Sequence, residues 1–119
     1  MEVIEVSNKI EETINKIQKT LLEIKERAEN RARSLAEYEN AIAITILKLK
    51  NGKINKYQGE DISSLPATLI EKTARGMCME QCFTKDKAEA EYKNVCMGLQ
   101  ALQAILNGYQ SINRHLDTR

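Results

Sequence analysis

The sequence lacks tryptophan, and its 119 residues include one proline, one phenylalanine and one histidine. β-Sandwiches and barrels need turn residues at intervals of about 8–12 positions. One proline and 5 glycines are too few to supply them, which argues against an all-β fold. Neither sign of charge is in large excess, since the sequence has 18 Lys and Arg residues and 17 Asp and Glu residues. The net charge of +1 therefore indicates no particular class of partner.

Long apolar runs are absent as well. The run Ala41–Ile44 is interrupted by Thr45, whereas a membrane span needs about 20 apolar residues. The first residues, Met1–Val6, are acidic and alternating, and no apolar run follows them as in a signal peptide. The 3 cysteines are an odd number. We therefore expect a cytoplasmic protein in a reducing compartment, with no membrane contact.

The sequence does contain a long heptad pattern. Two rows of residues between 3 and 49 alternate in steps of four and three, which places both rows on one face of a helix. The first row is Val3, Ile10, Ile17, Ile24, Arg31, Tyr38 and Thr45, and the second is Ser7, Ile14, Leu21, Ala28, Leu35, Ile42 and Leu49. About six heptads predict a coiled-coil-like helix over residues 3–50. Asn51 and Gly52 are a suitable stop, because both tolerate left-handed backbone.

A second long helix is predicted over residues 64–117, after a polar connector at 51–63. Ser63 or Ser64 can cap this helix, with Pro66 in its first turn. Four polar residues that begin at Thr84 interrupt its apolar pattern, so a kink or break is expected there. Two helices of similar length and a short connector favour a single all-α domain, residues 1–119, built as an antiparallel hairpin.

A two-helix hairpin has a thin core, and oligomerisation is the usual remedy when disulfides and metals are absent. We therefore expect self-association, by default as a homodimer that forms a four-helix bundle. The second helix contains a stripe of small residues: Gly98, Ala101, Ala104 and Gly108. Glycine within a helix costs about 1 kcal/mol relative to alanine. Close packing of another helix explains the stripe, so it is the candidate oligomer interface; tolerance on an exposed face is the alternative.

The connector is basic and is the first candidate binding site. Lys48, Lys50, Lys53 and Lys56 lie close together with no acidic residue between them, and Tyr57 follows. Lysines at a hairpin tip can contact phosphates, and a tyrosine can stack on a base. The alternative is that the lysines have no binding role and only keep the loop soluble. No recognised nucleic-acid-binding motif accompanies them.

A second candidate site comprises Arg27, Arg31 and Arg33, because Arg31 occupies an apolar row position of the first helix. With the connector lysines, these arginines could bind a small anion. The structural alternative is that Arg31 sets the helix register or faces Glu89 or Glu91 on the second helix.

The residues for catalysis or metal binding are few. Cys78, Cys82, Cys96 and His115 include zinc ligand types, but Cys96 and His115 are roughly 28 Å apart along a helix. One site within a subunit cannot gather all four, and buried cysteine acts as a small hydrophobe. No pair of nucleophile and base and no glycine-rich phosphate loop is present. We expect no enzyme activity, no metal and no cofactor.

Three stretches together carry a resemblance to a known group of proteins. They are Arg33–Tyr38 leading into Ile42–Lys50, then Leu65–Ile70 with Ala74–Gly76, and then Ala88–Lys93 leading into Leu99 and Ile112. In these stretches the chain resembles small helical-hairpin proteins encoded in the early, recombination gene region of bacteriophages and prophages of Gram-positive bacteria. The resemblance implies a phage origin and action in the host cytoplasm. It assigns no role to any residue.

We therefore expect a non-enzymatic interaction protein that associates with itself and binds a host macromolecule. It would inhibit a host enzyme or a defence system, as an anti-CRISPR does, by occupying its surface. One alternative is an oligomeric binder of a small anionic signalling nucleotide, using Arg27, Arg31, Arg33 and the connector lysines. Another is a nucleic-acid accessory factor that uses the basic connector.

Overall fold

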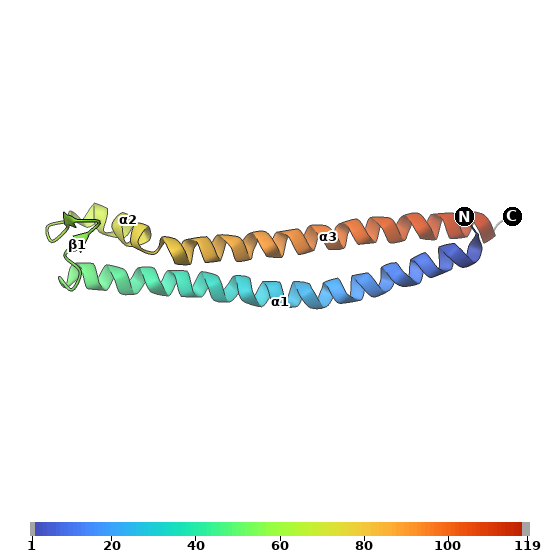
Figure 1. Cartoon of the computed structure of the whole chain (residues 1–119), viewed down its shortest axis with the longest axis horizontal. Coiled ribbons are helices and arrows are strands. Elements are labelled where there is room, and N and C mark those ends of the chain that lie inside the picture. The colour runs from blue at the N-terminus through green and yellow to red at the C-terminus, as the bar shows by residue number, and fades with distance from the viewer. Residues whose placement is uncertain (1, 118–119) are drawn as a thin grey trace. The chain divides into compact units, whose positions relative to one another are not determined.

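The computed structural model describes residues 2–117, and within that range the chain is almost entirely helical (Figure 1). The predicted all-α class is confirmed. The elements are α1 (Val3–Lys50), β1 (Lys56–Tyr57), β2 (Glu60–Asp61), α2 (Ala67–Met77) and α3 (Met79–Asp117).

The bounds of α1 agree with the predicted helix over residues 3–50. The helix ends where the sequence indicated, because Gly52 adopts a left-handed backbone with φ of +77°. This turn lets the N–H groups of Lys53 and Ile54 donate to the carbonyl of Lys48 at 3.0 and 3.3 Å. Such bonds satisfy a carbonyl that the last helical turn leaves without a partner.

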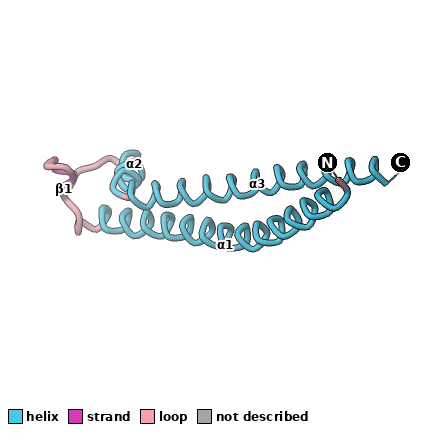
Figure 2. The backbone as a smooth tube through the Cα atoms, turned by 45° about the vertical axis from the view of Figure 1, so that its right-hand side comes forward, coloured by secondary structure: helices cyan, strands magenta, loops and turns pink. Residues whose placement is uncertain are grey.

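The connector contains a small β-hairpin that the sequence did not predict (Figure 2). β1 and β2 are antiparallel, with Lys56 opposite Asp61 and Tyr57 opposite Glu60. Gln58 and Gly59 form the two-residue turn, with φ of 52° and 81°. Positive φ at both positions is the hairpin geometry that matches strand twist. Strands of two residues are too short to produce a periodic pattern.

The second predicted helix is divided, and the division is not where the sequence placed it. α2 ends at Met77 and α3 begins at Met79, whereas the chain is helical through Thr84. At the break, the N–H of Cys78 is shared between the carbonyls of Ala74 and Arg75, at 3.1 and 3.2 Å. The predicted break near Thr84 is not found, because the four polar residues from Thr84 lie within the continuous helix α3.

The start of α2 also differs from the prediction. The helix begins at Ala67, with Pro66 in the cap position and no side-chain cap. Ser63 does not cap it. Instead, the hydroxyl and the backbone N–H of Ser63 donate to Asp61 Oδ1 at 2.7 and 2.9 Å. Ser63 thus stabilises the exit from the β-hairpin, as serine commonly does beside an aspartate in a turn.

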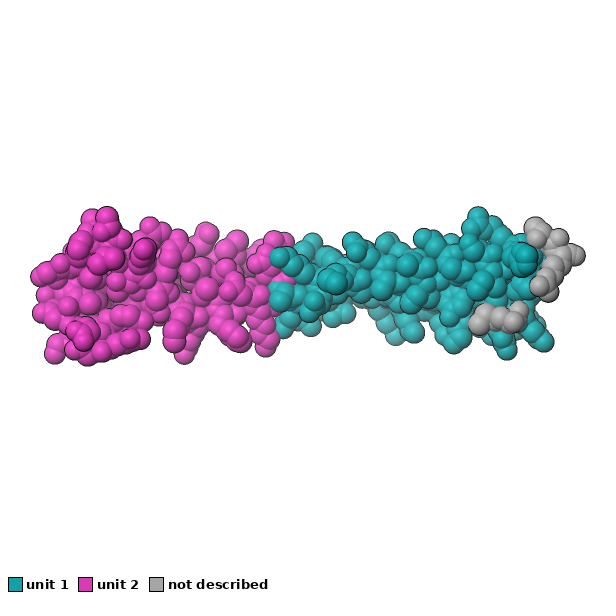
Figure 3. Space-filling model, turned by 90° about the horizontal axis from the view of Figure 1, so that it is seen from above, with its two compact units in different colours: residues 1–29, 90–119 teal, residues 30–89 magenta. Residues whose placement is uncertain are grey.

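The chain divides into two compact units (Figure 3). Unit 1 comprises residues 1–29 and 90–119, and unit 2 comprises residues 30–89. In unit 1 the first part of α1 packs against the later part of α3. Unit 2 contains the rest of α1, the β-hairpin, α2 and the start of α3. The helices of each unit run antiparallel, as predicted for a hairpin (Figures 1 and 2).

The buried face of α1 corrects the predicted heptad rows. Ile14, Leu21 and Leu35 of the second row are 38%, 51% and 45% exposed. Val6, Thr13 and Ser34, each one residue before a member of that row, are buried at 0%, 6% and 5%. Small side chains there make room for the facing helix. The hydroxyl of Thr13 donates to the carbonyl of Lys9 at 2.7 Å, which removes the cost of burying it.

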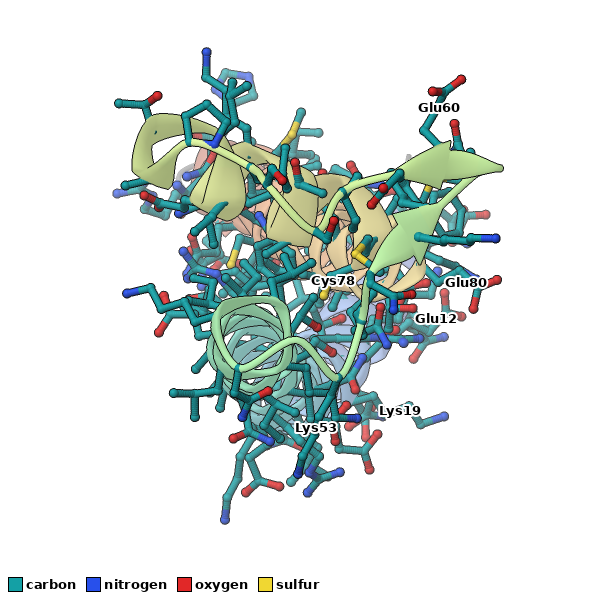
Figure 4. All side chains as sticks on the ribbon, turned by 90° about the vertical axis from the view of Figure 1, so that its left-hand side faces the viewer. Glu12, Lys19, Lys53, Glu60, Cys78 and Glu80 are labelled. Atoms are coloured by element: carbon teal, nitrogen blue, oxygen red, sulfur yellow. The ribbon has the colours of Figure 1, made fainter. Side chains whose placement is uncertain are left out.

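The core of unit 2 is formed by Tyr38 and Ile42 of α1 with Ala74 and Cys78. All four are at most 8% exposed. The break at Cys78 therefore lies inside this core, and Figure 4 shows its side chain directed between the helices. The Nζ atom of Lys85 lies 5.3 Å from the centre of the Tyr38 ring, a cation–π contact.

Candidate interaction surfaces

The connector lysines are in solvent but are not the only charges there. Lys48, Lys50, Lys53 and Lys56 are exposed (Figure 4 labels Lys53). The hairpin register sets Lys56 opposite Asp61. The hydroxyl and then the N–H of Ser63 lower the pKa of Asp61 by hydrogen bonding, so that this carboxylate is ionised at neutral pH. Its charge offsets part of the positive potential at the tip.

Tyr57 packs against α2. It is half-buried, and its hydroxyl would lie 3.5 Å from a Cβ built on Gly76. This is an ordinary contact distance, so the Tyr57 hydroxyl lies directly beside the backbone of Gly76. A ring held in this way anchors the β-hairpin to α2, and it must leave that position before it can stack on a base.

The arginines of α1 form ion pairs with α3. In unit 1, Arg27 Nη1 donates to Glu91 Oε2 at 2.8 Å. In unit 2, Arg31 Nη2 lies 3.5 Å from Glu89 Oε1, so the predicted pairing of Arg31 with an acid of the facing helix is confirmed. Arg33 is exposed. Because the charges of Arg27 and Arg31 are balanced locally, the arrangement does not favour an anion site built from the three arginines.

The cysteines of the described residues are free thiols and do not gather. Cys78 is buried, with its Sγ 3.5 Å from the Thr45 hydroxyl, and the Cys82 thiol lies 3.7 Å from Asp86 Oδ2. Between residues 2 and 117, no group of three or more His, Cys, Asp or Glu side chains could hold a metal ion. Cys78 thus serves the core as a small apolar side chain.

An exposed apolar surface on the first turns of α3 is a feature that the sequence analysis missed. Met79 and Phe83, four residues apart, are 66% and 69% exposed. With Glu80 and Thr84 they line a shallow hollow of about 520 Å³. We call these four residues the Phe83 surface. One signal was available, because the only phenylalanine of the sequence lies outside the apolar row of the second helix.

Two further hollows adjoin the Phe83 surface and share Glu80 and Gln81. One, of about 200 Å³, is also lined by Ser34, Glu37 and Thr84. The other, of about 320 Å³, also contains Tyr57, Gln58, Gly76, Met77 and Met79. Glu80 points away from the helices into solvent (Figure 4). Unit 2 therefore has one uneven surface with exposed apolar side chains beside two carboxylates, those of Glu37 and Glu80.

The stripe of small residues lies in unit 1. Gly98, Ala101, Ala104 and Gly108 are all exposed. A Cβ added to Gly98 or Gly108 would meet nothing within 4 Å. The described part of the chain therefore places no helix against the two glycines, and the use of this stripe as an oligomer interface stays a prediction.

Comparison with known proteins adds no assignment: no protein-family model matches the chain, and no curated protein or solved structure is significantly similar. Among the described residues, every helix is too short or too polar to cross a bilayer.

Proposed function

We propose that this chain is a non-enzymatic interaction protein that binds another protein through the Phe83 surface of unit 2. The observation that supports this function is the 69% exposure of Phe83 beside Met79, itself 66% exposed. Aromatic residues and methionine are enriched at protein interfaces relative to the rest of the surface. Removing either side chain fully from water contributes about 1.5–3 kcal/mol of favourable free energy, and a partner that covers the side chain gains this contribution.

The charges around the Phe83 surface specify the partner further. Glu80 lies within the surface, and Glu37 lines the adjoining hollow. A partner that covers Phe83 must also compensate these carboxylates, since an uncompensated charge in an interface is costly. The chemistry that fits is an apolar side chain flanked by Lys or Arg on the binding segment of the partner. Such a segment also gains from charge steering during association.

The resemblance to phage hairpin proteins supports a host protein as the partner. Binding would block a host enzyme or a defence complex by covering its working surface. Self-association of the chain, expected from its thin core, is part of the same proposal. The nucleotide-binding and nucleic-acid alternatives have less support, because Arg27 and Arg31 are paired with acids and Lys56 faces Asp61.

The test compares two substitutions of equally exposed apolar residues. Phe83→Ala removes the centre of the surface, whereas Leu22→Ala removes a side chain of α1 that is also 69% exposed. Tagged wild-type protein is used to capture a partner from bacterial lysate, and the purified partner is then titrated by calorimetry. We expect Phe83→Ala to weaken binding about tenfold or more, as a hot-spot residue does, with Leu22→Ala close to wild type.

Three results would count against the proposal. They are the absence of any saturable partner, equal affinities for Phe83→Ala and wild type, and an affinity that does not fall when Glu37 and Glu80 are replaced by lysine. Purified protein with an absorbance at 260 nm above that of tyrosine would instead favour the nucleotide or nucleic-acid alternative.

A further inference from the structure

The two helices of unit 1 differ sharply in charge. No charged residue occurs in α3 from Asn94 to Asn113. The facing part of α1 carries charges throughout, among them Lys9, Glu12, Lys16, Glu23 and Arg27. A helix face that stays in water normally carries charged residues. Their depletion is typical of the centre of a protein interface.

The outer face of this charge-free segment is both apolar and exposed. Met97, Ile105 and Ile112 are 65%, 48% and 42% exposed. The small residues Gly98, Ala101, Ala104 and Gly108 lie among them at helical spacing, so small side chains lie between large ones along one face. We call these seven residues the α3 face. All of them belong to unit 1.

The accessible area of the chain is large enough for a second copy to cover part of it. The chain exposes 8758 Å². A typical folded monomer of 13.5 kDa exposes about 6,500 Å², so the excess is roughly 2,200 Å². A stable interface removes about 1,200–2,000 Å² in total, that is, about 600–1,000 Å² from each copy. The excess of each chain is therefore more than large enough to contain one such interface.

We propose that two copies pair antiparallel along the α3 face, with a two-fold axis at Ile105. Gly98 and Ile112 each lie seven residues from Ile105, on opposite sides. The axis thus brings Ile112 of each copy against Gly98 of the other, and the contact occurs twice, as in any isologous interface. Because Gly98 has no side chain and open space above it, it provides the cavity that Ile112 fills.

Antiparallel pairing is favoured over parallel pairing by the same residues. In a parallel pair, Gly98 would face Gly98 and Ile112 would face Ile112. One end of the interface would then hold a void and the other would be crowded, and both faults destabilise packing. The inference rests on the self-association that forms part of the proposed function, and it specifies the surface and geometry.

The first experiment measures the mass of the full chain by light scattering and analytical ultracentrifugation over a range of concentrations. The wild type is expected to be a dimer. Ile105→Glu places two carboxylates at the axis and is expected to weaken dimerisation at least a hundredfold. Because Ile105 is half-exposed in the chain, the variant should keep its helical circular dichroism. Asn107→Glu, on the same exposed stretch of helix but outside the α3 face, is the matched control.

The second experiment tests the register. Gly98→Ile has room within its own chain, so folding should be unaffected. It should weaken the dimer about tenfold or more, because two isoleucines then compete for one cavity. Adding Ile112→Ala makes room again, and the double variant is expected to recover most of the lost affinity. Recovery is specific to contact between positions 98 and 112 of different copies.

The outcomes separate this inference from the binding of another protein through Phe83. A wild type that is monomeric at every concentration overturns the α3 dimer, whatever Phe83→Ala does to partner binding. A dimer that survives Ile105→Glu refutes the α3 face as the interface. A dimer broken by Ile105→Glu but not rescued by the double variant refutes the antiparallel register.

Discussion

Ile42 and Ile44 provide a direct test of which side of α1 carries the stability of unit 2. Ile42 is 7% exposed and packs with Tyr38, Ala74 and Cys78. Ile44, two residues later on the same helix, is 44% exposed. Truncation of a buried isoleucine to alanine costs about 2–5 kcal/mol, from lost transfer energy and the cavity that remains. We therefore expect Ile42→Ala to lower the free energy of unfolding by about 3 kcal/mol. The matched variant Ile44→Ala should change it by about 0.5 kcal/mol or less, as surface substitutions usually do.

The assays are urea unfolding and thermal unfolding followed by circular dichroism, each at two protein concentrations so that self-association is controlled. At roughly 4 °C per kcal/mol, Ile42→Ala should lower the melting temperature by roughly 12 °C. Both variants make the same chemical change to the same helix, so differences in helix propensity cancel. Equal losses for the two variants would refute the reasoning, because Ile44 would then have to be covered.

Three smaller effects are also expected. A double-mutant cycle on Arg27 and Glu91 should give a coupling of about 0.2–1 kcal/mol that decreases with salt, because both side chains are partly exposed; a larger or salt-independent value would contradict this. Gly52→Ala should cost about 1–2 kcal/mol through its positive φ alone, measured by urea unfolding. Ser63→Ala should raise the pKa of Asp61 toward 3.8 in an NMR titration. Since the wild-type pKa is lowered, the stabilisation from Asp61 is complete above about pH 4 and is lost as the pH falls through the folded-state pKa.

Much of the fold could be predicted from the sequence, because long heptad patterns report helices directly. The bounds of α1, its stop at Gly52 and the pairing of Arg31 all followed from spacing and residue type. The choice of the second row of α1 failed at Ile14, Leu21 and Leu35, although Ile42 of the same row is buried. Positions three and four residues from the first row are both near the seam, and apolar character favoured the wrong one. The structure buries Thr13, whose hydroxyl bonds to its own helix.

The candidate surfaces were harder to predict, because exposure depends on tertiary packing. The position of Phe83 outside the apolar row of the second helix did not by itself show that the fold leaves its side chain in solvent. The break at Cys78 has no glycine or proline at its own position, and it places Cys78 in the core with Tyr38 and Ile42 of α1. The basic connector was recognisable as a cluster, but the pairing of Lys56 with Asp61 depends on a β-hairpin too short to predict.

The two ion pairs between α1 and α3 have a consequence for how the helices find their alignment. A seam with side chains every seven residues can slip by one repeat with little loss of apolar contact. A shift of seven residues in one direction would set Arg27 against Gly98 and Arg31 against Cys96. The opposite shift would place Arg27 against Thr84 and Arg31 against Cys82. In neither shifted alignment does a carboxylate lie directly opposite Arg27 or Arg31. The two ion pairs stabilise the fold only slightly, but they favour the native alignment over both shifted ones.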